Sequence, residues 1–407
     1  MYFGLRRGGN HYYALDVTDP DNPSLLWTID QSGDFAELGM TFSSPRVGTV
    51  KYGASNTPVI IFGGGYDEDK DSGNADDSEG NAIYVVHAET GALVWKAKYG
   101  ASTGSQSATE YHHSGMVDSI PSDLAVFDSN SDGNIDRVYV GDTGGTVWRV
   151  DLPEGNVDNR TSWFASELAN LGRDDITPLT NSNDRRFFHR PDIVPSGDDF
   201  GAFDGVVIGS GNRADPQETQ TSNWLYLLKD RNTTTGSVAG NAYDHRDYDA
   251  STQTNGLDDI TNTCINDIDG CVVAGDLING WKLELEANGE KVLAPGLTAF
   301  GTIFFTTFLP EGEAEEAGTA CEPSEGGGRL YAVSIQDGSP VNNYDVTDGN
   351  DPALTKSDRF NALASGGIPA EVVPVGNYIL PPDLDPQSTG GRAFWKTFWY
   401  EKDVDSF

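Results

Sequence analysis

A short strand motif built around an aromatic residue recurs along the whole chain and restricts its fold more than any other feature. The aromatic residues of the six copies are Tyr13, Tyr84, Trp148, Tyr226, Trp281 and Tyr331. Two further β-rich runs precede most copies, as Ser44–Val50 and Val59–Gly65 precede Tyr84. Units of several short antiparallel strands that repeat in this way predict an all-β fold, a β-propeller.

The copies span most of the chain, and the tail at 367–380 could supply one more unit. We therefore expect a single propeller domain over residues 1–407, with seven blades. The segment Ser162–Leu171 is the one clear helix candidate. Two polar insertions, 67–80 and 311–328, are expected to be mobile. Because Met1–Arg7 is typical of the middle of a strand and not of a signal peptide, we expect the C-terminal part of a longer, exported precursor.

One nine-residue segment, 128–136, has the spacing of a calcium-binding loop. The oxygen-bearing side chains at its positions 1, 3, 5 and 9 belong to Asp128, Asn130, Asp132 and Asp136, and Gly133 stands at the sharp turn. Ca²⁺ takes six to eight oxygen ligands, and this spacing can wrap one loop around it. The backbone carbonyl of Asn134 would complete the set. The alternative is an Asp/Asn-rich surface turn.

The residues after this loop predict a β-hairpin. Calcium loops that join two helices carry Glu at position 12, where this chain has Tyr139. Arg137–Leu152 has the pattern strand, tight turn, strand, so the loop is expected to open a hairpin within a blade. A second acidic segment, Asp67–Glu79, alternates Asp residues, but its turn glycine is displaced by one position. We favour a flexible acidic insertion there over a second calcium site.

The charge of the chain excludes several classes of partner. Lys plus Arg number 26 and Asp plus Glu 63, which gives a net charge of −37. Such a surface repels nucleic acid and anionic membranes and attracts divalent cations. No run of about 18 apolar residues is present, so no membrane span is expected.

The three cysteines give no sign of a zinc site. Cys264 and Cys271 are close in the sequence, and Cys321 stands apart. A Cys264–Cys271 bridge is plausible in an oxidising compartment, although Cys321 could pair with either residue.

Several motifs together resemble one protein family. These motifs are Gly4–Gly9, Tyr13–Pro20, Pro23–Trp27, Phe62–Tyr66, Gly80–Tyr84, the loop 128–136 with Tyr139–Asp142, Trp148–Leu152, Gly280–Trp281 and Gly289–Val292. In this order they resemble the C-terminal propeller of the type IV pilus tip-associated adhesins, the PilY-type proteins. The resemblance implies a calcium site at 128–136 and a place at the pilus tip on the cell surface. It also implies a role in pilus extension, twitching motility and attachment. The implied partners are minor pilins and host or abiotic surfaces.

The blades also resemble those of quinoprotein alcohol dehydrogenases, which bind pyrroloquinoline quinone. This is the alternative function. The chain lacks the adjacent cysteine pair of those enzymes, and its calcium loop is expected within a blade, so we expect no enzyme. The segment Gly209–Ala214 fits a dinucleotide-binding pattern, but no helix is predicted after it, and a turn is favoured. For His112–His113 we expect a packing or surface role.

Overall fold

The computed structural model describes residues 1–155, 160–172, 181–236, 256–263, 265, 275–310, 326–345, 354–364, 366–375, 378–380, 382 and 387–388. The regular structure in these ranges is nearly all β. Four 3-10 helices accompany the strands there: η1 (Gly33–Phe35), η2 (Glu68–Asp71), η4 (Asn181–Asn183) and η6 (Lys356–Arg359). No helix in these ranges is long and apolar enough to span a membrane. The predicted disulfide and the insertion at 311–325 lie outside the described residues.

The described strands form six separate sheets, numbered here in chain order. Sheet 1 contains β1 (Tyr2–Gly4), β2 (Tyr12–Asp16) and β3 (Ser24–Ile29). Sheet 2 contains β4 (Arg46–Tyr52), β5 (Ser55–Gly63), β6 (Ala82–His87), β7 (Leu93–Tyr99) and β8 (Glu110–His113). Sheet 3 contains β9 (Ala125–Phe127), β10 (Arg137–Gly141), β11 (Thr146–Asp151) and β12 (Phe164–Asn170).

Sheets 4 to 6 complete the described fold. Sheet 4 contains β13 (Asp192–Asp198), β14 (Gly201–Gly209), β15 (Trp224–Asp230), β16 (Asp258–Asp259) and β17 (Gly280–Glu284). Sheet 5 contains β18 (Lys291–Val292), β19 (Leu297–Ala299), β20 (Thr302–Leu309), β21 (Gly327–Ser334) and β22 (Phe360–Ala362). Sheet 6 contains β23 (Val373–Val375), β24 (Tyr378–Leu380) and β25 (Gln387–Ser388). Paired strands are antiparallel, except that β7 and β8, and β16 and β17, run parallel.

Each sheet packs face to face on the next one in the chain. In β5, Ile60 and Phe62 belong to the core between sheets 1 and 2, whereas Val59 and Ile61 belong to the core between sheets 2 and 3. Three further cores join sheets 3 and 4, 4 and 5, and 5 and 6. The inner strands are buried on both faces, which explains their near-continuous apolar runs. This sequential packing of similar sheets confirms the propeller architecture.

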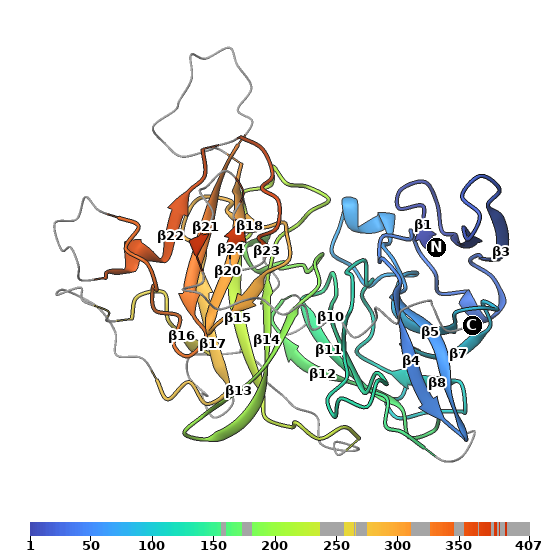
Figure 1. Cartoon of the computed structure of the whole chain (residues 1–407). Helices are drawn as coiled ribbons and strands as arrows, with labels where there is room; N and C mark the ends of the chain where they lie inside the picture. The colour runs from blue at the N-terminus through green and yellow to red at the C-terminus, as the bar shows by residue number, and fades with distance from the viewer. Residues whose placement is uncertain are drawn as a thin grey trace, which may run out of the picture.

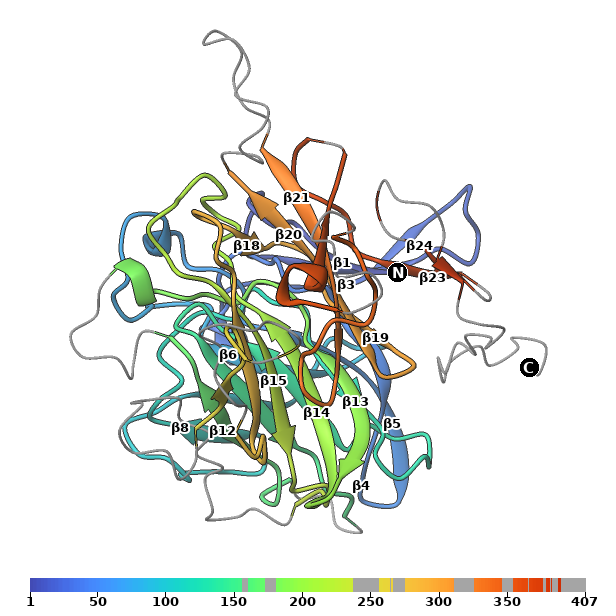
Figure 2. The same cartoon turned by 90° about the vertical axis from the view of Figure 1, so that its left-hand side faces the viewer.

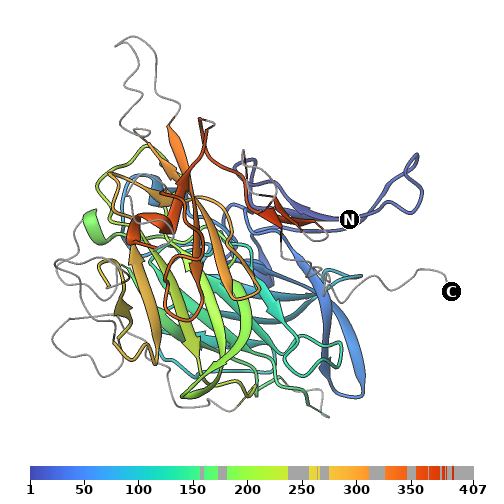
Figure 3. The ribbon, with the colours of Figure 1, turned by 60° about the vertical axis from the view of Figure 1, so that its left-hand side comes forward.

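The views show the order of the sheets. The blue N-terminal sheets and the orange C-terminal sheets lie on opposite sides of the green central strands (Figure 1). The turned view brings the orange strands β18, β20 and β21 forward (Figure 2). The three-stranded sheets 1 and 6 lie in the upper half of the molecule, with the N-terminus at the same height (Figure 3).

Two predictions of local structure are wrong. The segment Ser162–Leu171 is not a helix, because it contains β12, which pairs with β11. A β-bulge leaves Leu168 without a partner between Glu167 and Ala169, so Leu168 and Ala169 are buried side by side. This break in strict alternation imitates helical spacing in the sequence.

The copy at Trp281 does not begin a blade of its own. β17 pairs with β15 in sheet 4, where Trp281 faces Leu227. A strand pattern alone does not say whether the chain starts a new sheet or returns to the previous one. The tail does supply another sheet, sheet 6. The expected count of seven blades stays a prediction.

Candidate metal site in the loop between β9 and β10

The predicted calcium loop connects β9 to β10 and is folded tightly on itself. Ser131 and Gly133 have φ angles of 63° and 91°, in the left-handed region. Such angles are easy for glycine, and short polar residues tolerate them better than bulky ones. As predicted, the loop opens a hairpin, in which β10 and β11 pair from Arg137–Asp151 to Gly141–Val147.

The acidic side chains of the loop accept hydrogen bonds from its own backbone. Asp128 accepts from the N–H groups of Ser131 at 2.7 Å and Gly133 at 2.8 Å. Asp132 accepts from Asn134 N–H at 2.9 Å. The buried carboxylate of Asp136 accepts from Ser129 N–H at 2.7 Å. Burial tends to raise the pKa of Asp132, but these hydrogen bonds outweigh burial and hold its pKa below the ordinary value.

The loop is anchored to the neighbouring sheet. Thr49 in β4 donates its hydroxyl to the carbonyl of Gly133 at 2.6 Å, and its own carbonyl accepts from Ile135 N–H at 2.8 Å. The Ile135 side chain is buried in the core between sheets 2 and 3, against Gly48. The conformation of this loop is therefore coupled to the contact between two blades.

Sequence reasoning missed one carboxylate at the loop, that of Glu154. Its Oε1 accepts from the Asn134 amide at 3.0 Å, and its Oε2 pairs with Lys51 at 2.9 Å. The hairpin register contains the signal for this contact. Since Arg137 faces Asp151, three more residues along each strand bring Asn134 beside Glu154.

The fit to a cation can be tested on the loop's own atoms. The side-chain oxygen of Asn134 is buried and has no hydrogen-bond partner. The oxygens of Asp128, Asn130, Asp132 and Asp136 are hard ligands of the kind that Ca²⁺ prefers. In this conformation, however, no group of three or more His, Cys, Asp or Glu side chains in the described ranges is arranged to hold a metal ion. The donor set fits calcium, and the carboxylates would have to turn inward from their backbone partners.

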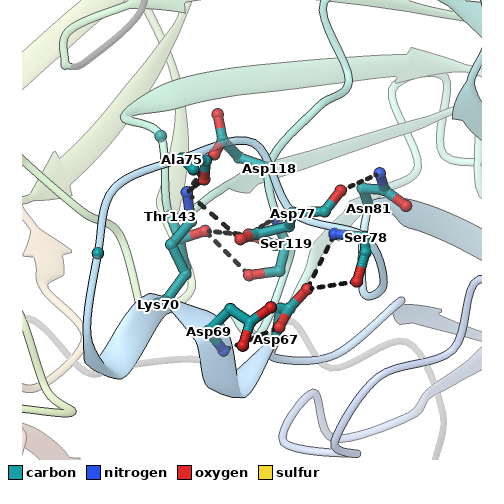
Figure 4. A network of polar contacts seen from close by, with 12 residues as sticks. Asp67, Asp69, Lys70, Ala75, Asp77, Ser78, Asn81, Asp118, Ser119 and Thr143 are labelled. Atoms are coloured by element: carbon teal, nitrogen blue, oxygen red, sulfur yellow. Dashed lines mark hydrogen bonds and ion pairs between the residues drawn. The ribbon is translucent and has the colours of Figure 1, made fainter.

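The second acidic segment is an ordered part of the structure and contains a lysine at its centre (Figure 4). Asp67 caps η2 by accepting from Asp69 N–H at 2.9 Å and also accepts from Ser78 N–H at 2.9 Å. The ammonium of Lys70 lies 2.5 Å from Asp118 and 3.4 Å from Asp77, and all three side chains are buried. The expectation of a mobile insertion is wrong here, because Asp67, Lys70 and Asp77 are buried and hydrogen-bonded. Lys70 offsets part of the negative charge.

Comparisons with known proteins agree with this architecture. Residues 1–170, which include the loop 128–136, match the model of the PilY1 β-propeller domain. The type IV pilus biogenesis factor PilY1 of Pseudomonas aeruginosa PAO1 is 35% identical over 159 residues, which covers 38% of this chain and 11% of that protein. A PilY1 homologue of Xylella fastidiosa is 24% identical over 91% of this chain and 24% of its own length. The chain thus spans only a small part of these relatives.

A solved structure shows the same fold. The C-terminal domain of Pseudomonas aeruginosa PilY1 matches with a TM-score of 0.64 at 20% sequence identity, over 96% of this chain and 80% of that one. This likeness confirms the β-propeller.

Proposed function

Since the chain is a propeller of the PilY1 C-terminal type, we propose that it acts as the calcium-binding module of a type IV pilus tip adhesin and biogenesis factor. The observation that carries this proposal is the family match over residues 1–170. In this role the module supports pilus extension, twitching motility and surface attachment. Its partners are minor pilins and host or abiotic surfaces, and it acts outside the cell, at the pilus tip.

Calcium is proposed as a local switch in this module. Without a cation, Asp128, Asp132 and Asp136 repel each other, and Glu154 adds a fourth carboxylate beside them. Bound Ca²⁺ would supply the positive charge that draws these oxygens together. Because Thr49 and Ile135 tie the loop to sheet 2, ordering the loop stiffens one contact between blades. A pilus partner would then recognise that edge of the propeller.

Calorimetric titration of calcium tests the site. We expect a Kd of about 10–100 μM, since position 12 lacks the usual glutamate. At roughly 1 mM Ca²⁺ this affinity stabilises the fold by about 1.4–2.7 kcal/mol. Asp132→Ala should abolish this binding and leave the β-sheet circular dichroism unchanged, and Glu154→Gln should weaken it. Asp21→Ala, on an exposed turn, is the matched control. Unaltered binding in Asp132→Ala would refute the site, and global unfolding would refute its local character.

The module is proposed to be non-enzymatic. The sequence lacks the adjacent cysteines expected of a quinone site. Reconstitution with pyrroloquinoline quinone and alcohols should give no dye reduction above background. Clear turnover would favour the quinoprotein alternative.

A further inference from the structure

A cavity of about 240 Å³ opens where loops of five sheets meet. Arg6 comes from sheet 1, Phe42 precedes β4, Pro121 precedes β9, His189 precedes β13, and Pro295 precedes β19. We call it the arginine pocket, after four of its lining residues: Arg6, Arg7, Arg190 and Arg213. Such a concentration of positive charge is unexpected in a chain whose net charge is −37.

Three of these four arginines form no ion pair with a carboxylate among the described residues. Arg7 pairs with Asp71 at 2.9 Å. Arg190 lies in the field of Arg46 and Asp192. Arg6, Arg190 and Arg213 form no ion pair in the described ranges.

The guanidinium groups of Arg6 and Arg213 affect each other, and Nη1 of Arg213 also donates to the carbonyl of Leu293 at 3.0 Å. Burial lowers the pKa of Arg213, and the positive charge of Arg6 lowers it further. The chain also holds Arg6 at a φ of 53°, an uncommon conformation for this residue type. Strained backbone of this kind tends to cluster at functional sites.

A half-buried histidine adds an unpartnered polar atom to the same wall. Nε2 of His189 is inaccessible to solvent and has no hydrogen-bond partner. Burial lowers the pKa of His189 to about 3, helped by the charges of Arg213 and Arg6. The single acidic lining residue, Asp123, is paired with Arg46 at 3.1 Å.

The rest of the pocket is lined by aromatic and other apolar residues. The partly exposed rings of Phe42 and Phe188 pack on the buried Tyr66, with ring centroids 6.0 Å and 5.8 Å from its own. Prolines and Ala214 extend this apolar lining. Guanidinium groups recognise planar acidic groups by paired hydrogen bonds, and aromatic walls favour a flat apolar body. A volume below the ~300–1,000 Å³ of drug-sized sites favours a small ligand.

We infer that the arginine pocket binds a small organic anion with two or more carboxylate or phosphate groups on a flat apolar body. This inference gives the segment Gly209–Ala214, which fits a dinucleotide-binding pattern, a different role: it places Arg213 at the pocket. It forms a turn, in which Asn212 accepts from Ala214 N–H at 3.0 Å, and this turn directs Arg213 to the pocket. The site is distinct from the calcium loop.

Isothermal titration of the intact chain with isophthalate at pH 7 and low salt tests the inference. We expect saturable one-to-one binding that weakens as NaCl is added. Isophthalamide, which has the same shape without charge, should not bind. Inorganic phosphate should bind at least tenfold more weakly, because it lacks the apolar body. Equal binding of phosphate and isophthalate would overturn the proposed ligand class, and no binding of isophthalate would overturn the site.

Variants locate the binding. Arg213→Gln and Arg6→Gln should each weaken isophthalate binding at least tenfold. Lys356→Gln removes one charge from an exposed pair with Glu286 and should change binding less than twofold. Asp132→Ala should leave isophthalate binding intact, which separates this site from the calcium loop. Arg213→Lys keeps the charge and serves if Arg213→Gln fails to fold. Unchanged affinity in a folded Arg213 and a folded Arg6 variant would refute the assignment.

Discussion

At the scale of single residues, buried charge is compensated by particular partners. Lys70 is enclosed by Asp77, Asp118 and the carbonyl of Ala75, which lies 2.7 Å from its ammonium. Two carboxylates and one ammonium leave the cluster short of positive charge. Burial raises the pKa of Asp77, and Lys70 opposes this shift only in part. Lys70 therefore compensates part of the negative charge of Asp77 and Asp118, which would otherwise be buried without a counter-ion.

Replacing Lys70 by Met should lower the free energy of unfolding by about 3–5 kcal/mol at pH 7. Without Lys70 the pKa of Asp77 lies further above its unfolded value, so the penalty is greatest at neutral pH and shrinks as the carboxylate is protonated. Urea unfolding at pH 7 and pH 5 should show the gap to wild type narrowing at pH 5. Lys356→Met, at an exposed ion pair, should cost under about 1 kcal/mol. A gap that is independent of pH would contradict this account.

His113 makes the stability of the contact between sheets 2 and 3 sensitive to acid. Its ring is nearly perpendicular to that of Trp148, with centroids 4.9 Å apart, and its Nδ1 accepts from Gly115 N–H at 3.1 Å. Burial lowers the pKa of His113 to about 4. Protonation would place a charge in this largely buried site, so the folded state resists it. The packing role expected for this histidine agrees with its position.

Acidification should therefore cost the wild type stability through His113. Between its unfolded pKa near 6.5 and its folded pKa, only the unfolded state binds the proton. Stability is thus lost as pH falls from 7 to 5, by about 2 kcal/mol from this residue. His113→Gln removes this titration. As the pH falls from 7 to 5, the free energy of unfolding of His113→Gln, measured with urea, should rise by that amount relative to wild type. A constant difference between the two proteins would show that His113 is not responsible.

At the scale of elements, glycines set how closely adjacent sheets approach. Gly63 ends β5, and a Cβ atom there would lie 2.3 Å from the carbonyl oxygen of Ile120, in the segment that leads into β9. The contact is with backbone, which cannot rotate away. This close approach holds sheet 2 against the start of sheet 3.

Gly63→Ala should lower the free energy of unfolding by about 1–3 kcal/mol through overpacking. Gly73→Ala is the control, since a Cβ there meets only one atom, at 3.9 Å. Chemical denaturation of both variants measures the difference. Equal free energies of unfolding for Gly63→Ala and Gly73→Ala would mean that sheets 2 and 3 can move apart at no energetic cost.

The whole molecule carries strong self-repulsion. With 63 acidic and 26 basic residues, the net charge is −37, and acidic groups far outnumber basic ones. Salt screens such repulsion within about 10 Å at 0.1 M ionic strength. Pairs such as Lys70–Asp118 are buried and are screened much less.

Raising NaCl from about 0.05 to 0.5 M should therefore raise the melting temperature, as seen by calorimetry. The same rise in Asp132→Ala would show that the effect is general and independent of the loop 128–136. A melting temperature that falls with salt would mean that surface ion pairs outweigh the net repulsion.

Sequence alone determined the features that depend on local pattern. The aromatic strands at Tyr13, Tyr84 and Trp148 predicted the all-β fold, because burial on both faces of a blade demands apolar runs. The spacing of 128–136 predicted a tight loop, because Asp and Gly at fixed offsets favour such a turn. The pattern of 137–152 predicted the hairpin that the loop opens. The metal itself stays a prediction.

Only the tertiary structure decided what depends on residues far apart in the chain. It placed Trp281 in the same sheet as Leu227, because strand pairing over about fifty residues leaves no local mark. It brought Lys70 to Asp118, and it brought Arg6 and Arg213 to one pocket. Local patterns fix which segments become strands, whereas the packing of successive sheets fixes which side chains meet.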